Sequence, residues 1–167
     1  MDDPVFSRRS IRRYTDEPVT DAQVELLLRA AMAAPSAGNQ QPWQFVVLRD
    51  PEDFRAIAAW HPYAAMLPKA SVAIVVCGTP DECKWPQMWE QDCSAATENI
   101  LVEAAALGLG AVWLGVHPLE ERVGALREQL GVPQEVVPFA VVSVGHPAER
   151  KPPSGRFDPA RVHAGRW

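Results

Sequence analysis

A cluster of arginines near the start of the chain is the first feature that could do chemistry. Arg8, Arg9, Arg12 and Arg13 place four guanidinium groups within six residues of a chain whose net charge is -5. Guanidinium groups bind phosphate oxygens in a bidentate manner, and the hydroxyl of Ser10 between them can donate to a further oxygen. The cluster therefore predicts a phosphate-binding cradle. A solvated basic turn is the alternative. A nucleic-acid arm is a weaker one, because no aromatic residue is interleaved to stack on bases.

A polar segment further along the chain could bind a flat ligand. It reads Ala34-Pro35-Ser36-Ala37-Gly38-Asn39-Gln40-Gln41-Pro42-Trp43. Pro35 has no N–H to donate and ends the preceding helix, and Gly38 gives the backbone freedom at the apex of the turn. The three amide side chains after Gly38 offer donors and acceptors that suit a planar ligand with heteroatoms along its rim. The alternative is a helix-to-strand connection that is merely polar.

The rest of the sequence lacks the side-chain sets of common catalytic sites. It has no Gly-x-Ser-x-Gly motif, no Walker loop and no obvious carboxylate pair. Cys77, Cys83 and Cys93 form no Cys-x-x-Cys pair, and the four histidines are scattered, so we expect neither a disulfide framework nor a metal site. Such a chain can still be an enzyme if a bound cofactor carries the reaction.

Hydrophobic periodicity predicts helices that alternate with strands. Thr20-Asp21-Ala22-Gln23 is a capping box that starts a helix leading to Pro35, and Asp50-Pro51 starts another. Further helices are predicted over residues 92–107 and 119–130, and strands over residues 43–48, 71–77, 111–115 and 136–144. The continuous apolar character of residues 71–77 predicts burial on both faces of that strand. The alternation alone would indicate an α/β fold.

The segment from Gly78 to Met88, just before Trp89, has no clear pattern. Trp85 and Trp89 lie four residues apart, at helical spacing. This spacing favours packing in the core or at an interface, and an aromatic lid over a planar ligand is the alternative.

Two glycines mark the start of a predicted strand. Gly108-Leu109-Gly110 ends a helix and opens the strand at Ala111, whereas the glycines of a dinucleotide-binding fold follow a strand and open a helix. We therefore expect no such fold here. The end of this strand could instead offer backbone N–H groups around Trp113, Leu114 and Gly115 to the edge of a ligand.

Composition bounds the kind of protein. With 167 residues, of which 47% are hydrophobic and 22% charged, we expect one globular domain over residues 1–167. The negative net charge argues against a nucleic-acid partner. The acidic start lacks the apolar region of a signal peptide, and the longest uncharged apolar run, Ala104 to Val116, is too short to span a bilayer. We therefore expect a cytoplasmic protein without a membrane partner.

The last part of the chain, residues 145–167, is rich in proline and basic residues and has no periodicity. Such a composition is typical of a disordered tail. Phe157, Val162 and Trp167 are apolar points along it, which favours an extended arm that lies on another surface.

The motif Arg8-Arg9-Ser10-Ile11-Arg12, followed by the segment from Ala34 to Trp43, resembles the opening of the FMN-dependent nitroreductase family in order, spacing and identity. The resemblance extends to Gly108-Leu109-Gly110 and to the basic tail. It implies an α+β, three-layer fold with a mixed central β-sheet flanked by helices. It also implies an intertwined homodimer, with an extended C-terminal arm reaching the partner and FMN at the dimer interface.

The resemblance further implies an FMN-dependent oxidoreductase. NADH or NADPH would reduce the flavin, and an electron-poor acceptor such as a nitroaromatic or a quinone would then be reduced over the same ring face, in a ping-pong cycle. A flavin-binding sensor or storage protein is the alternative, and an anion-binding interaction domain without flavin is a weaker one.

The resemblance and the chemistry of the flavin together assign the site residues. No side chain is expected to be catalytic. Arg8, Arg12 and Arg156 are expected at the phosphate, Asn39 and Gln41 at the pyrimidine edge, and a backbone donor near Gly115 at N5; Arg12 would also stabilise charge near N1 and O2. The full predicted cofactor-binding set is Arg8, Arg9, Ser10, Arg12, Pro35, Ser36, Ala37, Gly38, Asn39, Gln41, Trp113, Leu114, Gly115 and Arg156.

Overall fold

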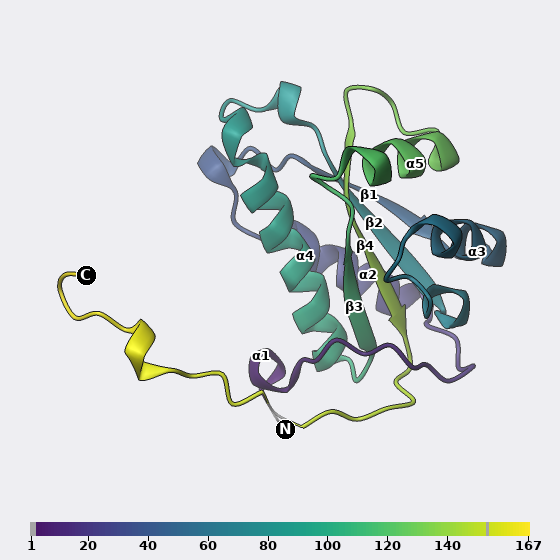
Figure 1. The fold of residues 1–167 in the computed structure, drawn as a ribbon, viewed down its shortest axis with the longest axis horizontal. Helices are drawn as coiled ribbons and strands as arrows, with labels where there is room; N and C mark the ends of the chain where they lie inside the picture. Colours follow the sequence, from purple (N-terminus) through teal and green to yellow (C-terminus); the bar gives the residue numbers. More distant parts are fainter. Residues whose placement is uncertain (1–2, 153) are drawn as a thin grey trace.

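The computed structural model describes residues 3–152 and 154–167 (Figure 1). Its α-helices and strands are, in chain order, α1 (Pro4–Ser7), α2 (Asp21–Met32), β1 (Trp43–Leu48), α3 (Pro51–Trp60), β2 (Val72–Gly78), α4 (Trp89–Ala106), β3 (Gly110–Gly115), α5 (Glu120–Leu130) and β4 (Val137–Gly145). The four strands form one sheet in the order β1-β2-β4-β3. Within the described residues, no helix combines the length and the apolar character needed to cross a bilayer.

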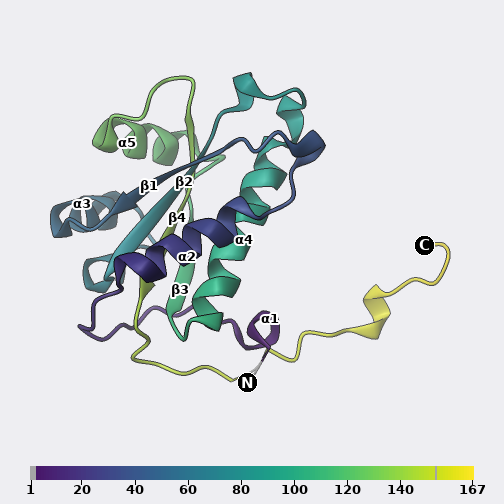
Figure 2. The ribbon, with the colours of Figure 1, turned by 180° about the vertical axis from the view of Figure 1, so that it is seen from behind.

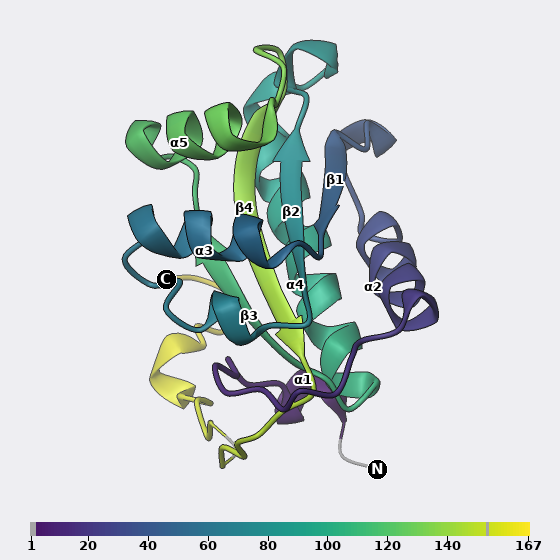
Figure 3. The same ribbon diagram turned by 90° about the vertical axis from the view of Figure 1, so that its right-hand side faces the viewer.

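Helices cover both faces of the sheet and give the expected three layers. α2 and α4 lie on one face (Figure 2), and α3 and α5 lie on the other (Figure 3). Alternate residues of β2 point to opposite faces, so Ile74 belongs to the core under α2 and α4, whereas Val75 belongs to the core under α3 and α5. Both side chains are fully buried, which confirms the predicted burial of this strand on both faces.

The pairing within the sheet differs from the mixed sheet that the family resemblance implies. All neighbouring strands run antiparallel. The reason lies in the connections: α3 and α5 lie across the strands rather than along them, so the chain re-enters the sheet at the end that it left (Figure 3). Among the described residues, parallel pairing is limited to an isolated bridge between Ser10 and Ala111. This bridge attaches the arginine segment, residues 8–12, to the outer edge of β3.

The predicted helix ends are confirmed by their capping contacts. Thr20 Oγ1 accepts the N–H of Gln23 at 3.2 Å, and Gln23 Oε1 accepts the N–H of Thr20 at 2.9 Å. Asp50 Oδ1 accepts the N–H of Glu52 at 2.8 Å at the start of α3. Gly131 ends α5 in the left-handed region, with a φ of 64°.

The segment before α4 separates the two tryptophans. Residues 80–82 and 86–88 form short 3-10 turns, and α4 begins at Trp89 rather than at Asp92 because the second turn leads directly into it. Trp89 is 7% exposed, and its ring centroid lies 5.7 Å from that of Phe139 in an edge-on contact. Trp89 therefore follows the core-packing prediction, whereas Trp85 is 44% exposed.

The chain after β4 leaves the sheet and extends away from the helices (Figure 1). Its described residues from Arg150 onward are exposed, including the apolar side chains of Phe157, Val162 and Trp167. The short 3-10 turn in this segment, residues 159–161, is held by a local hydrogen bond, in which the N–H of Arg161 donates to the carbonyl of Asp158 at 3.1 Å. The extended path agrees with an arm, and its contact with a second subunit stays a prediction.

Candidate functional site

The arginine segment is fixed to the edge of β3 by its backbone. The N–H of Ile11 donates to the carbonyl of Ala111 at 3.0 Å, and the Ile11 side chain is buried against Gly110. Only a glycine permits this approach, since a Cβ at position 110 would lie 2.6 Å from Cγ2 of Ile11. The outer edge of β3 is open beyond Ala111 because β3 is the last strand of the sheet. The bridge therefore carries Arg12 to that open edge.

Arg12 lines a cavity of about 480 Å³ along the edge of β3, which we call the Arg12 cavity. Its walls are Arg12, His61, Tyr63, Ala65, Met66, Trp113, Leu114 and Gly115. The carbonyl groups of Ala111 and Gly115 have their hydrogen-bond partners on the side opposite to β4. Every second residue of a strand points its N–H and C=O groups to the same side, so the N–H groups of Trp113 and Gly115 also point to this open edge. The structure thus brings four predicted site residues together: Arg12 and the strand end 113–115.

The Arg12 cavity has one formal charge among its lining residues, the guanidinium of Arg12. His61 is 2% exposed. Burial lowers the pKa of its imidazole below the ordinary 6.5, and the charge of Arg122 acts in the same direction, against the hydrogen bond to Gly115. The ring is therefore neutral near pH 7. Such a set of cationic and N–H donors suits a ligand that is rich in acceptors.

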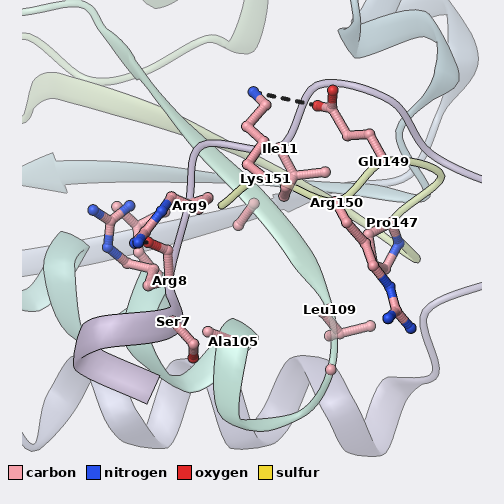
Figure 4. Close-up of a pocket in the computed structure, with 13 residues that line it drawn as sticks. Ser7, Arg8, Arg9, Ile11, Ala105, Leu109, Pro147, Glu149, Arg150 and Lys151 are labelled. Carbon is pink, nitrogen blue, oxygen red and sulfur yellow. Dashed lines mark hydrogen bonds and ion pairs between the residues drawn. The ribbon is translucent and has the colours of Figure 1, made fainter. Parts of the chain in front are cut away.

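Arg8 and Arg9 line a second cavity, of about 310 Å³, between α1, α4 and residues 147–151 (Figure 4). Apolar side chains from α4 and β3 line part of it, and its rim carries three further charged residues, Glu149, Arg150 and Lys151. Arg8 Nε lies 3.2 Å from Glu98 Oε1, and Arg9 Nε donates to the carbonyl of Pro152 at 2.7 Å. We call this the Arg8 cavity.

Glu149 and Lys151 tie the arginine segment to the chain after β4. Glu149 accepts the backbone N–H of Arg12 at 2.6 Å, and Lys151 Nζ donates to the carbonyl of Ser10 at 2.5 Å. The two side chains also pair with each other at 3.4 Å, the dashed line in Figure 4. The pKa of the Glu149 carboxyl is held below its ordinary value, mainly by the hydrogen bond from the Arg12 N–H and to a lesser extent by the charge of Lys151. These contacts use backbone atoms of the segment and leave the Arg12 side chain to the cavity.

The Pro35 loop, residues 35–42, is held from behind by α4. Asp92 is 5% exposed and accepts the N–H of Ala37 at 2.9 Å and Nε2 of Gln40 at 2.7 Å. The Gln40 amide also accepts the N–H of Trp85 at 3.0 Å and donates to its carbonyl at 3.1 Å. Gln40 is therefore committed to contacts within the protein, unlike its two amide neighbours.

The other two amides of the loop are exposed. Gly38, Asn39 and Gln41 have φ values of 55°, 56° and 50°, in the left-handed region. Such a conformation costs of order 1–3 kcal/mol at each non-glycine residue, so the fold retains strain here. Asn39 and Gln41 bond to each other, with Gln41 Nε2 donating to Asn39 Oδ1 at 3.0 Å. Ser36 Oγ accepts the N–H of Gln41, and Pro35 is exposed at the start of the loop.

One chain does not bring all the predicted site residues together. The Arg12 cavity, the Arg8 cavity and the Pro35 loop share no lining residue. Arg156 is exposed in the arm. Within a single chain, the predicted site residues are therefore divided among separate places.

The model of one protein family, described as "Nitroreductase family", matches residues 5–75 and 58–146, which include the Pro35 loop and β3. The chain belongs to the nitroreductase family. This membership agrees with the three-layer architecture and with the motif resemblance.

Individual relatives of this nitroreductase-family protein match it along nearly its whole length. A protein of Archaeoglobus fulgidus, provisionally named NADH dehydrogenase/NAD(P)H nitroreductase, is 52% identical over 98% of this chain and 96% of its own. A Clostridium acetobutylicum structure, provisionally named NADH oxidase, is 48% identical with a TM-score of 0.95 and covers 99% of this chain and 100% of its own. A Desulfovibrio desulfuricans structure, provisionally named a nitroreductase and solved in complex with FMN, is 35% identical with a TM-score of 0.84 over 98% of this chain and 95% of its own.

Sequence reasoning missed several residues of this nitroreductase-family site. His61 and Tyr63 lie in an irregular connection and Arg122 lies in a helix, and no motif surrounds them. Asp92 did carry a signal, because it lies four residues before Ala96 and eight before Ile100, on the apolar face of a predicted helix. An acidic residue on such a face needs hydrogen-bond donors, and here the Pro35 loop supplies them.

Proposed function

We propose that the protein is an FMN-dependent oxidoreductase that uses NAD(P)H to reduce an electron-poor acceptor, such as a nitroaromatic or a quinone. The observation that carries the proposal is the Arg12 cavity, where a guanidinium and the open N–H edge of β3 line the same space. Family membership supports it. So do the NAD(P)H in the name of the Archaeoglobus relative and the FMN bound to the Desulfovibrio relative.

The donors of the two cavities fit FMN in kind and in sign. A phosphate requires cations and hydroxyl donors. Arg8 and Arg9 of the Arg8 cavity suit the first need, and the hydroxyl of Ser10, which precedes the cavity residue Ile11 in the chain, suits the second. Arg150 and Lys151 add positive charge on the rim of the Arg8 cavity, a role that sequence reasoning gave to Arg156. The rim of the flavin ring is rich in acceptors, for which Arg12 and the strand end 113–115 are suited.

The residues of the chain bind and orient the cofactor. When bound, FMN supplies the redox chemistry, since it accepts a hydride from NAD(P)H and passes it to the acceptor. With FMN bound, the Arg12 guanidinium would be the residue of this cavity that stabilises negative charge on the reduced flavin ring. The N–H groups at the end of β3 are donors for ring acceptors. His61 is not a general acid here, because its Nε2 proton is used on the carbonyl of Gly115.

We further propose a homodimer in which the Pro35 loop of one chain completes the Arg12 cavity of the other. The exposed amides of Asn39 and Gln41 suit the pyrimidine edge of the flavin. Both residues have strained, left-handed backbones. Among the described residues, their side chains bond only to each other, so no contact outside the loop accounts for this strain. Residues 1–167 would form a single FMN-binding domain, with residues 145–167 as the arm onto the partner. The free cysteines Cys77, Cys83 and Cys93 suit a reducing compartment such as the cytoplasm.

Anaerobic titration of the purified protein with NADH or NADPH tests the proposal. We expect a yellow protein that loses its flavin on denaturation, is bleached by the reductant and regains its colour when a quinone or nitroaromatic is added. A yellow protein that neither reductant bleaches would favour a flavin sensor or store. A colourless protein that FMN does not reconstitute would refute the proposal.

A further inference from the structure

The carbonyl of Gly115, at the end of β3, receives two hydrogen bonds from outside the sheet. His61 Nε2 lies 3.0 Å from the oxygen, and Arg122 Nη1 donates to it at 2.8 Å. The two donors come from different elements, the connection after α3 and the first turns of α5. This carbonyl faces away from β4, so these two donors hold it in place of a ladder partner.

The proton on His61 is assigned by its second contact. The N–H of Tyr63 donates to Nδ1 of His61 at 3.2 Å, so Nδ1 is an acceptor and the neutral ring carries its proton on Nε2. The ring is buried and lies between Trp60 and Tyr63, at centroid distances of 5.6 and 6.2 Å. His61 therefore donates to Gly115 from a fixed position.

Arg122 is also held in position. Its guanidinium carbon lies 5.8 Å from the centroid of the Tyr63 ring, within range of a cation–π contact. Tyr63 and His61 both line the Arg12 cavity, whereas Arg122 acts on the cavity through the Gly115 carbonyl. The cavity wall at residues 61–63 and the start of α5 are thus joined at one backbone oxygen.

Gly115 is a residue that requires such support. It has no side chain, and a Cβ built on it would meet nothing within 4 Å, so no side-chain packing of its own helps to fix its backbone. Its carbonyl and its N–H both face the open edge of β3. The two donors fix the peptide unit that follows Gly115, and the ladder pairing of Leu114 fixes the unit that carries the Gly115 N–H, so both sides of the glycine are held with its N–H toward the cavity.

We propose that His61 and Arg122 are positioning residues, which hold the end of β3 so that its outward N–H groups meet the flavin. This inference rests on the proposed function. Neither side chain needs to touch the cofactor. Loss of either donor would loosen the peptide unit that follows Gly115 and would weaken the contact between protein and flavin, since hydrogen-bond strength falls steeply with misalignment.

The test compares variants of the flavin-loaded protein by three measurements: the FMN dissociation constant from flavin fluorescence, the midpoint potential of the bound flavin, and Tm. Arg122→Ala should raise the dissociation constant about tenfold and make the potential more negative. His61→Phe should act in the same direction. Arg122→Lys and His61→Gln each keep one donor and should recover part of both effects. Arg55→Ala removes an exposed arginine on α3, changes the net charge equally and should change neither flavin property.

A purely structural role would give a different result. If Arg122→Ala and His61→Phe lower Tm but keep the wild-type dissociation constant and potential, the proposal is overturned. If either fails to fold, the comparison moves to Arg122→Lys and His61→Gln, and unchanged flavin properties in both would overturn it as well. A wild-type protein that cannot be loaded with FMN refutes the proposed function itself, which separates that failure from this one.

Discussion

The Arg12 cavity and the Pro35 loop both carry residues of the motifs that resemble the family. Within one chain, the cavity is enclosed by several elements, whereas one side of the loop is exposed. The cavity draws on the arginine segment, the connection after α3 and the end of β3, and the contact between His61 and the Gly115 carbonyl joins the last two of these. The loop is held from behind by Asp92 and by the backbone of Trp85. On its other side, Asn39 and Gln41 are exposed and pair with each other.

This difference indicates how the two regions are used. The contacts around the cavity form when the chain folds, so its shape is set within one chain. The loop is equally well supported, yet its left-handed residues present two amides outward, where they are accessible to a ligand or a second chain. Four expected outcomes test this contrast, from the largest effect to the smallest.

The double variant Arg8→Ala/Arg12→Ala removes one guanidinium group from each of the two cavities. We expect the FMN dissociation constant to rise at least about 100-fold, because each hydrogen bond between charged groups contributes about 1.5–3 kcal/mol. Fluorescence titration measures the affinity, and circular dichroism checks that the fold survives. Arg29→Ala/Arg55→Ala removes two exposed arginines, on α2 and α3, and is the matched control. Full retention of flavin by the double variant would show that these arginines have another role.

Asp92→Ala removes the support behind the Pro35 loop. We expect the free energy of unfolding to fall by about 2–3 kcal/mol, because the N–H of Ala37 and the amide of Gln40 lose a buried, charged acceptor. Urea denaturation measures the change. Asp81→Ala, an exposed carboxylate in the segment before α4, should shift the stability by less than about 0.5 kcal/mol. Equal losses in the two variants would contradict the supporting role of Asp92.

Acid should lower the free energy of unfolding through the protonation of His61. Burial lowers the pKa of His61 in the folded protein below 6.5, its ordinary value, so on acidification the unfolded chain takes up a proton before the folded protein does. The free energy of unfolding should therefore decrease as the pH falls through 6.5 toward the lower folded-state pKa, and should be insensitive to this group above 6.5. Urea denaturation over a pH series of wild type and His61→Gln measures this, and the variant should lack that part of the pH dependence. Parallel curves would contradict it.

A chain that ends at residue 155 removes most of the exposed arm. We expect the free energy of unfolding, extrapolated to low protein concentration, to change by less than about 0.5 kcal/mol, because the removed side chains are exposed. The dimer should weaken if the arm lies on the partner. Sedimentation velocity over a dilution series measures this, and an unaltered dimer would place the subunit contacts outside the arm.

Local patterns predicted the secondary structure well because their causes are local. The capping box at Thr20, the Asp50 cap and the left-handed Gly131 depend on residues within one turn of each other. The start of α4 was placed too late at Asp92, because the 3-10 turn of residues 86–88 feeds directly into the helix and gives no separate signal. The Arg12 assignment came from the arginine motif and the Gly115 assignment from the end of a predicted strand, and the structure places these two residues in one cavity.

The sequence by itself determined the helices and strands, the strand end at Gly115, the outward turn at Gly38 and the family resemblance, because each depends on short-range spacing or on residue identity. Tertiary structure alone decided the antiparallel pairing and the neighbours of each motif: Ile11 on Ala111, His61 and Arg122 on one carbonyl, Asp92 behind the loop. The physical reason is that a hydrogen bond between residues far apart in the chain depends on how whole elements pack, and no local pattern encodes that packing.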